Sequence, residues 1–403
     1  MITVAEAEAI IKSSIKVFDG SQTDMVPLAA SLDRVLAENI YPERSLPPFD
    51  RATMDGFAIK VEENETIPLV FKIKGTVFAG QIKNIKTKFA ECVEIMTGAP
   101  LPPDLNCVVP IEQTNIDQGT VHIKKNYIPE VNQYIHKMGS DINVKTRLLT
   151  SGKRITVPDL LLLAASGKER IKVKRLPRIM LVITGDEIAP IGKNIESFQI
   201  RPVSQYGIQG ALNKRFLSDL DIILTGDDPK LLETTLNSAI KSKDIIIFTG
   251  GVSMGKHDYV KDTIASSCDG PGFHKVLQKP GFPFMFASKK SGQLIFGLPG
   301  NPVSSIICLY RYIIPAIQWC IGEASNRPYQ IATLIGETPM PHGLSYFLPV
   351  NLISPNSTDL KVRPMPTNTS GDFITLGKSD GFIEISDNSQ SGSTNKKYPF
   401  TPW

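Results

Sequence analysis

Carboxylates follow three predicted strand ends in the second half of the chain. Asp186 and Glu187 come directly after one apolar strand, and Asp227 and Asp228 come after the next one. Asp258 follows a glycine-rich loop after a third strand. In proteins Mg²⁺ is held by one or two carboxylates together with substrate phosphates. The pattern therefore predicts a metal or polar-ligand site, although an Asp at such a turn can also cap the following helix.

The glycine-rich loop is Thr249-Gly250-Gly251-Val252-Ser253-Met254-Gly255. Glycines allow tight turns and close backbone approach, so that successive N–H groups can hold an anion at the start of a helix. The loop has neither the Gly-Lys-Ser/Thr of a Walker A motif nor the G-x-G-x-x-G pattern. It predicts a phosphate-binding loop, with an ordinary strand-to-helix turn as the alternative.

Two further segments could take part in chemistry. Lys275 and Lys279 lie four residues apart beside a turn, where point charges can hold an oxyanion, although surface lysines are also common there. Residues 47–58 combine two prolines with Asp50 and Asp55 in an irregular segment. Rigid loops of this kind often carry function.

Four apolar strands must position these loops. They are predicted at residues 178–183, 221–224, 244–248 and 293–296, and each runs into a polar, glycine-rich turn and then a helical pattern. Strands that are apolar on both faces indicate a parallel sheet covered by helices on both sides. Ligands bind at the carboxyl ends of such strands, so we expect the carboxylates and the glycine-rich loop to share one edge.

The rest of the chain differs in character. A capping box at Thr3 and Glu6 predicts a helix to about residue 17, and a second helix is expected around 28–38. Alternating stretches separated by turn residues predict an antiparallel β module with strands near 69–73, 91–95 and 121–123. We therefore expect an α/β multidomain protein with a central three-layer α/β/α domain of mostly parallel strands. Its predicted parts are a helical elongated dimerisation domain (1–45 plus 143–176), an irregular β module (46–142), the α/β domain (177–325) and a small C-terminal β-barrel-like domain (326–403).

Composition narrows the class of protein. The 403 residues carry 44 Lys and Arg against 40 Asp and Glu, a net charge of +4 with no basic run, so we expect no nucleic-acid partner. Residues 1–6 do not have a signal-peptide pattern, and the apolar stretch 306–321 falls short of a membrane span. The five dispersed cysteines favour a reducing cytoplasm.

Six segments occur in a characteristic order: residues 48–58, 95–100, 184–187, 250–255 with Asp258-Tyr259, 279–281 and 297–302. Together they resemble the MoeA family of molybdopterin molybdenumtransferases, which includes the E domain of gephyrin. The resemblance implies an elongated four-part subunit and a homodimer. It also implies an active cleft between the α/β domain of one subunit and the β module of the other.

The implied reaction is insertion of molybdate into the dithiolene of adenylated molybdopterin, with release of AMP and with Mg²⁺ as cofactor. By position, the cleft carboxylates and metal ligands would be Glu187, Asp227 and Asp258. Lys275 and Lys279 would face anionic oxygens, and Asp55 and Thr97 would reach in from the partner subunit. The implied residues that bind molybdopterin are Thr184, Gly185, Asp186, Gly250, Gly251, Ser253, Gly255, Pro299 and Asn301.

Several cations of the family pattern are absent. Leu344 and Pro349 stand where arginines are usual, Phe282 replaces a lysine, and Ile200-Arg201 is followed by Pro202-Val203-Ser204. The basic run before Gly139 is reduced to His136-Lys137-Met138. Our hypothesis is that the catalytic carboxylates and lysines are present, but that fewer residues bind the oxyanion, which would be molybdate or tungstate. The available substitute cations are Lys289, Lys290 and Arg201.

Two alternatives remain at the level of sequence. A molybdopterin adenylyltransferase has a similar sheet domain and would consume ATP; such an enzyme could also be a partner that delivers the substrate. A non-catalytic paralogue would bind molybdopterin or a protein without turnover, and an apolar groove at the C-terminal domain would favour it.

Overall fold

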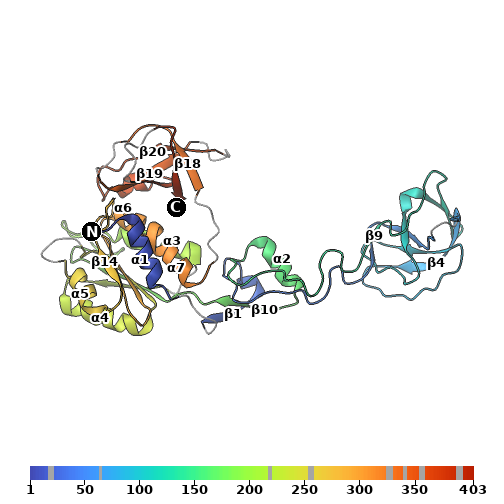
Figure 1. The fold of residues 1–403 in the computed structure, drawn as a ribbon, viewed down its shortest axis with the longest axis horizontal. Helices are drawn as coiled ribbons and strands as arrows, with labels where there is room; N and C mark the ends of the chain where they lie inside the picture. The colour runs from blue at the N-terminus through green and yellow to red at the C-terminus, as the bar shows by residue number, and fades with distance from the viewer. Residues whose placement is uncertain are drawn as a thin grey trace.

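The computed structural model describes residues 1–16, 22–62, 66–216, 220–252, 258–323, 330–338, 343–353, 359–386 and 394–403. The molecule is elongated (Figure 1). A large α/β domain and a C-terminal β domain lie at one end, a narrow region follows, and a β module lies at the far end.

The α/β domain is built on a six-stranded sheet in the order β12-β11-β13-β17-β16-β14. Its four parallel strands confirm the predicted parallel sheet: β11 (Ile179–Thr184), β12 (Leu220–Thr225), β13 (Ile245–Thr249) and β17 (Leu294–Leu298). All residues of β11, β13 and β17 are buried, which explains their continuous apolar runs. Two antiparallel strands, β16 (Met285–Ser288) and β14 (Gly272–His274), extend one edge.

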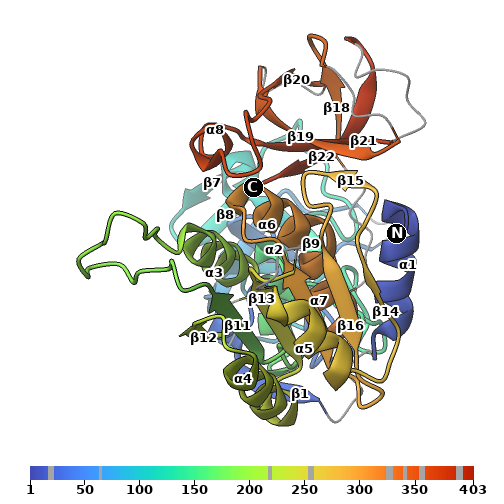
Figure 2. The same ribbon diagram turned by 90° about the vertical axis from the view of Figure 1, so that its left-hand side faces the viewer.

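Helices cover both faces of this sheet (Figure 2). One face holds α4 (Pro229–Ser242) and α5 (Tyr259–Ser267), which share a core with strand side chains. The other face holds α3 (Val203–Phe216) and the continuous helix α6 (Pro302–Cys308), η3 (Leu309–Ile313) and α7 (Ile314–Cys320). Residues Pro302–Cys320 have the length and hydropathy of a membrane span, but 72% of that window is buried within the protein. This is the character of a core helix.

The N-terminal helix α1 (Val4–Ser14) begins at the predicted capping box. The Thr3 hydroxyl accepts from the Glu6 N–H at 3.2 Å, and the Glu6 carboxylate accepts from the Thr3 N–H at 2.8 Å. Its buried residues Val4, Ala7 and Ile11 pack into the core of the α/β domain. This position differs from the prediction that grouped residues 1–45 with 143–176.

The narrow region contains β1 (Thr23–Pro27) paired with β10 (Arg170–Lys174), and the helix α2 (Val157–Ala165). The helix expected around 28–38 is wrong: only the 3-10 turn η1 (Leu28–Ala30) forms. Leu36 N–H donates to Lys153 O and Ala37 N–H donates to Lys172 O, each at 2.9 Å. These long-range backbone bonds take the place of the local helix.

The β module has a six-stranded sheet in the order β6-β3-β5-β4-β8-β7. Its strands are β3 (Gly56–Ile59), β4 (Val70–Val77), β5 (Glu91–Ile95), β6 (Cys107–Pro110), β7 (Thr114–Asp117) and β8 (Thr120–Ile123). A smaller pair joins β2 (Arg51–Ala52) to β9 (Ile135–His136), and η2 (Ile111–Gln113) follows β6. β4 and β5 are parallel, unlike the antiparallel pairing expected. The long connection 78–90 allows the chain to return in the same direction.

The C-terminal domain is a closed five-stranded barrel, as expected. Its strands are β18 (Gln330–Leu334), β19 (Ser345–Leu352), β20 (Leu360–Pro364), β21 (Gly381–Ile385) and β22 (Lys397–Pro402), with the short helix α8 (Phe373–Leu376) between β20 and β21. A strand of the α/β domain, β15 (Gln278–Lys279), pairs with β19. Arg311 in η3 also bonds Glu384 of β21 at 2.9 Å and Glu8 of α1 at 2.8 Å. The predicted domain boundary at 326 lies outside the described residues.

Candidate active site

A cavity of about 380 Å³ lies at the carboxyl ends of the parallel strands. Its walls come from the turns after β11, β12, β13 and β17 and from the start of α3. Nine of the predicted site residues line this cavity: Thr184, Gly185, Glu187, Asp227, Gly250, Gly251, Asp258, Pro299 and Asn301. The predicted residues of the α/β loops therefore do meet at one edge of the sheet.

The glycine-rich loop requires its glycines. Gly250 has a φ of 96°, and a Cβ there would lie 2.7 Å from Thr184 Oγ1 and 2.9 Å from Thr184 O. Gly251 has a φ of 63°, and a Cβ there would lie 2.7 Å from a methyl carbon of Val260. Larger residues at either position would push the loop away from the sheet. The predicted ligands Ser253 and Gly255 lie outside the described residues.

The carboxylates have separate roles. Asp228 accepts a hydrogen bond from the Leu231 N–H at 2.8 Å and caps α4, so the capping alternative holds for this residue. Asp186 is not among the residues that line the cavity, and its Oδ1 accepts from the Asp227 N–H at 3.2 Å. Glu187, Asp227 and Asp258 line the cavity itself.

The surroundings of Asp227 change its pKa. Partial burial raises the pKa of its carboxyl, and the neighbouring Asp186 and Glu187 raise it further. A hydrogen bond from Thr184 acts in the opposite direction on the pKa of Asp227. The cavity thus concentrates negative charge that a cation would relieve.

The donor set suits Mg²⁺ with substrate oxygens rather than a protein-only cage. Within the described parts of the chain, no three His, Cys, Asp or Glu side chains form a group that could hold a metal ion. Mg²⁺ commonly takes one or two carboxylates and completes its octahedron with water and phosphate oxygens. Glu187, Asp227 and Asp258 as metal ligands remain a prediction.

The two predicted lysines do not line the cavity. Lys275 has a φ of 73°, and its Nζ lies 6.0 Å from the centroid of the Phe282 ring. Lys279 lies on β15, where it is paired with Tyr346 of β19. Between Lys275 and the end of β16, the chain lines the cavity at one residue, Pro283.

The start of α3 also lies at the cavity, which the sequence pattern did not predict. Pro202, Val203, Ser204 and Gln205 line the cavity. Gln205 Oε1 is buried and has no hydrogen-bond partner in the described structure, so it can accept from a ligand. The departure from the family pattern after Ile200-Arg201 was the signal that could have identified this segment.

Of the three substitute cations, only Arg201 lies at the cavity; it is the one Lys or Arg among the described lining residues. Its guanidinium donates to Pro190 O at 2.5 Å and to Lys193 O at 2.8 Å. Lys289 and Lys290 follow β16 at the opposite end of the sheet, where Lys289 Nζ donates to Ser267 O at 2.7 Å.

Asp55 and Thr97 meet each other in the β module. Both the N–H and the hydroxyl of Thr97 donate to Asp55 Oδ1 at 2.7 Å. These bonds, the backbone one first, lower the pKa of the Asp55 carboxyl. The module lies at the opposite end of the molecule from the cavity, so one chain does not bring this pair to the other predicted residues (Figure 1).

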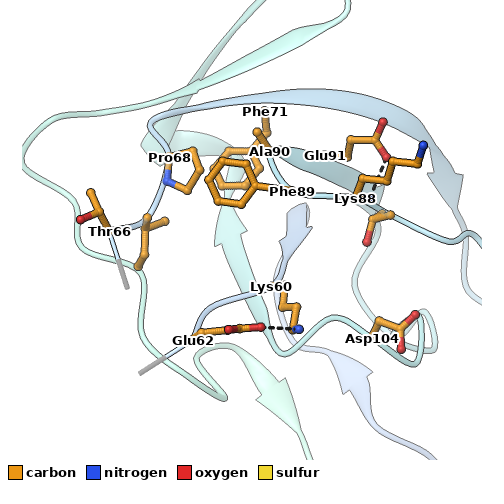
Figure 3. A pocket seen from close by; sticks show the side chains of 12 residues that line it. Lys60, Glu62, Thr66, Pro68, Phe71, Lys88, Phe89, Ala90, Glu91 and Asp104 are labelled. Carbon is orange, nitrogen blue, oxygen red and sulfur yellow. Dashed lines mark hydrogen bonds and ion pairs between the residues drawn. The ribbon is translucent and has the colours of Figure 1, made fainter. Parts of the chain in front are cut away.

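A second cavity of about 340 Å³ lies in the β module (Figure 3). Two contacts join residues of its lining: Lys60 pairs with Glu62, and Glu91 accepts from the backbone N–H of Lys88 at 2.8 Å. Phe89 borders the cavity and is 80% exposed. This arrangement offers no convergent set of catalytic groups.

Comparisons with known proteins agree with this organisation. Residues 2–167 match the family described as the MoeA N-terminal region (domain I and II), and residues 180–319 match a probable molybdopterin binding domain. A molybdopterin molybdenumtransferase from Synechocystis is 33% identical over 404 residues and covers 100% of both chains. One from Haemophilus influenzae is 31% identical over 304 residues, covering 75% of this chain and 74% of its own. The crystal structure of a molybdopterin biosynthesis MoeA protein from Pyrococcus horikoshii has a TM-score of 0.81 at 26% identity, covering 100% of this chain and 99% of its own.

Proposed function

Because the chain belongs to the MoeA family of molybdopterin molybdenumtransferases, we propose that its cavity inserts molybdenum from molybdate into adenylated molybdopterin and releases AMP. One observation carries this proposal. The glycines of the predicted anion-binding loop and three carboxylates border a single cavity at the carboxyl ends of parallel strands. The reaction needs both, because its substrates are anions and its chemistry includes phosphoryl cleavage.

The backbone binds the anionic groups. Gly250 and Gly251 adopt positive φ and turn the chain closely over the end of β11. The helices α3 and α6 both begin at the cavity, at Val203 and Pro302. Helix N-termini favour negative charge, so the phosphate groups of the adenylated substrate belong at this end of the cavity.

The carboxylates would act where the phosphate bond of the adenylated substrate is cleaved. Glu187, Asp227 and Asp258 would hold Mg²⁺, which when bound offsets the charge of the phosphate oxygens. Asp227 also sits beside Thr184 and two further acids, so its carboxyl can orient the attacking water and accept a proton from it. Lys275 and Lys279 would approach the anionic oxygens when the substrate and partner subunit are in place.

The partner subunit completes the site. We place Asp55 and Thr97 of a second copy over the cavity, in a homodimer with two composite clefts. The support is the separation of the two half-sites in one chain and the preformed Asp55–Thr97 bonds. The compartment we expect is the cytoplasm.

The test is AMP release from adenylated molybdopterin with Mg²⁺, with and without molybdate or tungstate. We expect release that depends on the oxyanion and that the Asp258→Ala variant loses. Pterin binding without AMP release in the unaltered protein would contradict the proposal. ATP consumption with free molybdopterin would instead support the adenylyltransferase alternative.

One observation favours a second function in protein binding. An apolar cavity of about 460 Å³ lies between α3, η3, α8 and the C-terminal Trp403, lined by Tyr206, Ile306, Tyr310, Phe373 and Leu376 among others. A scaffold paralogue that binds a protein segment there would retain this cavity and show no AMP release. The same assay therefore separates the two functions.

A further inference from the structure

The connection between β11 and α3 projects from the α/β domain as a long loop (Figure 2). Its base is closed by backbone bonds: Ala189 N–H donates to Ile200 O at 2.9 Å, and Ile200 N–H donates to Glu187 O at 2.8 Å. The second bond joins the loop directly to a carboxylate residue of the cavity. The shape of the loop and the position of Glu187 are therefore linked.

Few of the large apolar side chains of this loop are buried in the core. Phe198 is 70% exposed, Ile191 is 56% exposed, and Ile195 is 47% exposed, whereas Ala189 at the base is buried. Apolar packing cannot keep a segment closed when its large apolar side chains face solvent. Polar contacts must do so instead.

Arg201 supplies those contacts. Its Nη1 donates to Pro190 O at 2.5 Å and lies 3.5 Å from Ala189 O, and its Nη2 donates to Lys193 O at 2.8 Å. A guanidinium presents a rigid fork of donors, so one side chain can bond carbonyls on both sides of the turn at Gly192. A lysine has all its donors on one nitrogen, so it fits carbonyls on both sides of the turn less well.

We infer that Arg201 is a positioning residue that closes the loop 188–200 and thereby holds Glu187 at the cavity. Its two terminal nitrogens donate to loop carbonyls, so we assign its main role to the loop rather than to the oxyanion. For its consequence on turnover, this inference rests on the proposed function. Its structural part can be tested without any enzymatic assay.

Trypsin provides that test, because Lys193 is the sole Lys or Arg in residues 188–200 and Arg201 is followed by Pro202, which blocks cleavage there. Cleavage after Lys193 requires the loop to open, since its carbonyl is held by Arg201. We expect Arg201→Gln to raise the rate of cleavage at Lys193 about tenfold or more relative to cleavage at other sites. Arg201→Lys should give an intermediate rate and serves as the milder variant if Arg201→Gln does not fold.

The matched control is Arg178→Gln at the opposite end of β11, because its partner Asp244 keeps the bonds from Arg175. Its cleavage at Lys193 should equal that of the unaltered protein. In the AMP assay, Arg201→Gln should lower kcat and leave the molybdate concentration for half-maximal rate unchanged. An unchanged cleavage rate in Arg201→Gln, or a raised molybdate requirement that Arg201→Lys rescues, would overturn the inference. Absence of AMP release in the unaltered protein would refute the proposed function alone.

Discussion

At the scale of single residues, the cavity is a place where stability and chemistry conflict. Burial raises the pKa of the Asp227 carboxyl above the ordinary value of 3.8, and three nearby acids, Asp186, Glu187 and Asp258, raise it further. An ionised carboxylate there is less favourable in the folded chain than in water. A carboxyl group in a cavity with a pKa raised by burial and neighbouring acids is typical of a functional site.

We predict that Asp227→Asn abolishes AMP release without lowering the thermal stability of the free protein. Removing one negative charge relieves repulsion from Asp186 and Glu187, so the melting temperature should stay equal or rise by about 1 °C. Added Mg²⁺ should raise the melting temperature of the unaltered protein and have little effect on this variant. Thermal melts at several Mg²⁺ concentrations would check this, and a full Mg²⁺ response in the variant would remove Asp227 from the metal ligands.

The same raised pKa predicts a pH dependence. The protonated Asp227 favours the fold, so its contribution to stability is complete below the ordinary pKa of 3.8 and is lost as pH rises through the raised pKa. Mg²⁺ competes with that proton. We therefore expect the Mg²⁺-induced rise in melting temperature to shrink as pH falls toward the raised pKa. An Mg²⁺ effect that stays constant as the pH is lowered stepwise toward 3.8 would contradict this assignment.

Two glycines at the cavity, Gly250 and Gly300, differ in the space that an added methyl group would find. Gly250→Ala would place a methyl group 2.7 Å from Thr184 Oγ1 at a φ of 96°, which we expect to cost about 2 kcal/mol or more of stability and to remove AMP release. Gly300 borders the same cavity, but a Cβ there would meet nothing closer than Gly250 Cα at 3.6 Å. Gly300→Ala should fold with ordinary stability. Equal melting temperatures for the two variants would show that the loop can adjust.

At the scale of elements, the parallel strands were predictable because burial on both faces forces their residues to be apolar. The predicted strand 244–248 became β13 (Ile245–Thr249), and 293–296 became β17. The helix predicted at residues 28–38 does not form, because backbone groups of this segment bond residues between 152 and 174, far along the chain. The parallel pairing of β4 and β5 was missed for the same reason: pairing partners across a long connection leave no local pattern.

The sequence predicts only those site residues that lie in loops directly after the parallel strands. The turns after β11, β12, β13 and β17 met as expected because strand ends meet at one edge. The start of α3 and the engagement of Arg201 depend on how the chain returns from the loop 188–200. Side-chain partners of that kind cannot be read from residue spacing.

The core helix illustrates how an element supports a distant loop. The Tyr312 hydroxyl in η3 donates to Gln278 Oε1, and Gln278 Nε2 donates to Pro280 O at 3.3 Å and to Gly281 O at 3.2 Å. Gln278 is fully buried and adjoins Lys279. The helix therefore fixes the segment that carries a predicted substrate lysine.

We predict that Tyr312→Phe lowers the free energy of unfolding by about 1–3 kcal/mol, because it leaves the buried Gln278 Oε1 without a donor. Denaturation followed by tryptophan fluorescence suits this test, since Trp319 lies on the adjoining α7. Tyr206→Phe is the control, because that side chain is 51% exposed and should lose little. An unchanged unfolding midpoint for Tyr312→Phe would show that Gln278 finds another partner.

At the scale of the whole molecule, the cavity and the Asp55–Thr97 pair are far apart within one chain (Figure 1). The cavity lies in the α/β domain, and the Asp55–Thr97 pair lies in the β module at the far end of the elongated structure (Figure 1). The connection 78–90 in the same module carries Lys83, Lys86 and Lys88 and no acid, whereas the cavity carries Glu187, Asp227 and Asp258. Opposite charges of this kind favour contact between the module of one copy and the cavity of another.

A mixing experiment decides whether that contact makes the active site. Asp55→Ala and Asp227→Asn should each be inactive alone as homodimers. If the clefts are composite, unfolding, mixing in equal amounts and refolding should yield heterodimers in which one cleft carries both changes and the other carries neither. Random pairing makes about half of the dimers mixed, each with one intact cleft, so about a quarter of the unaltered activity should return. A site built within one chain would leave every cleft in the mixture altered at Asp55 or at Asp227, and no activity would return.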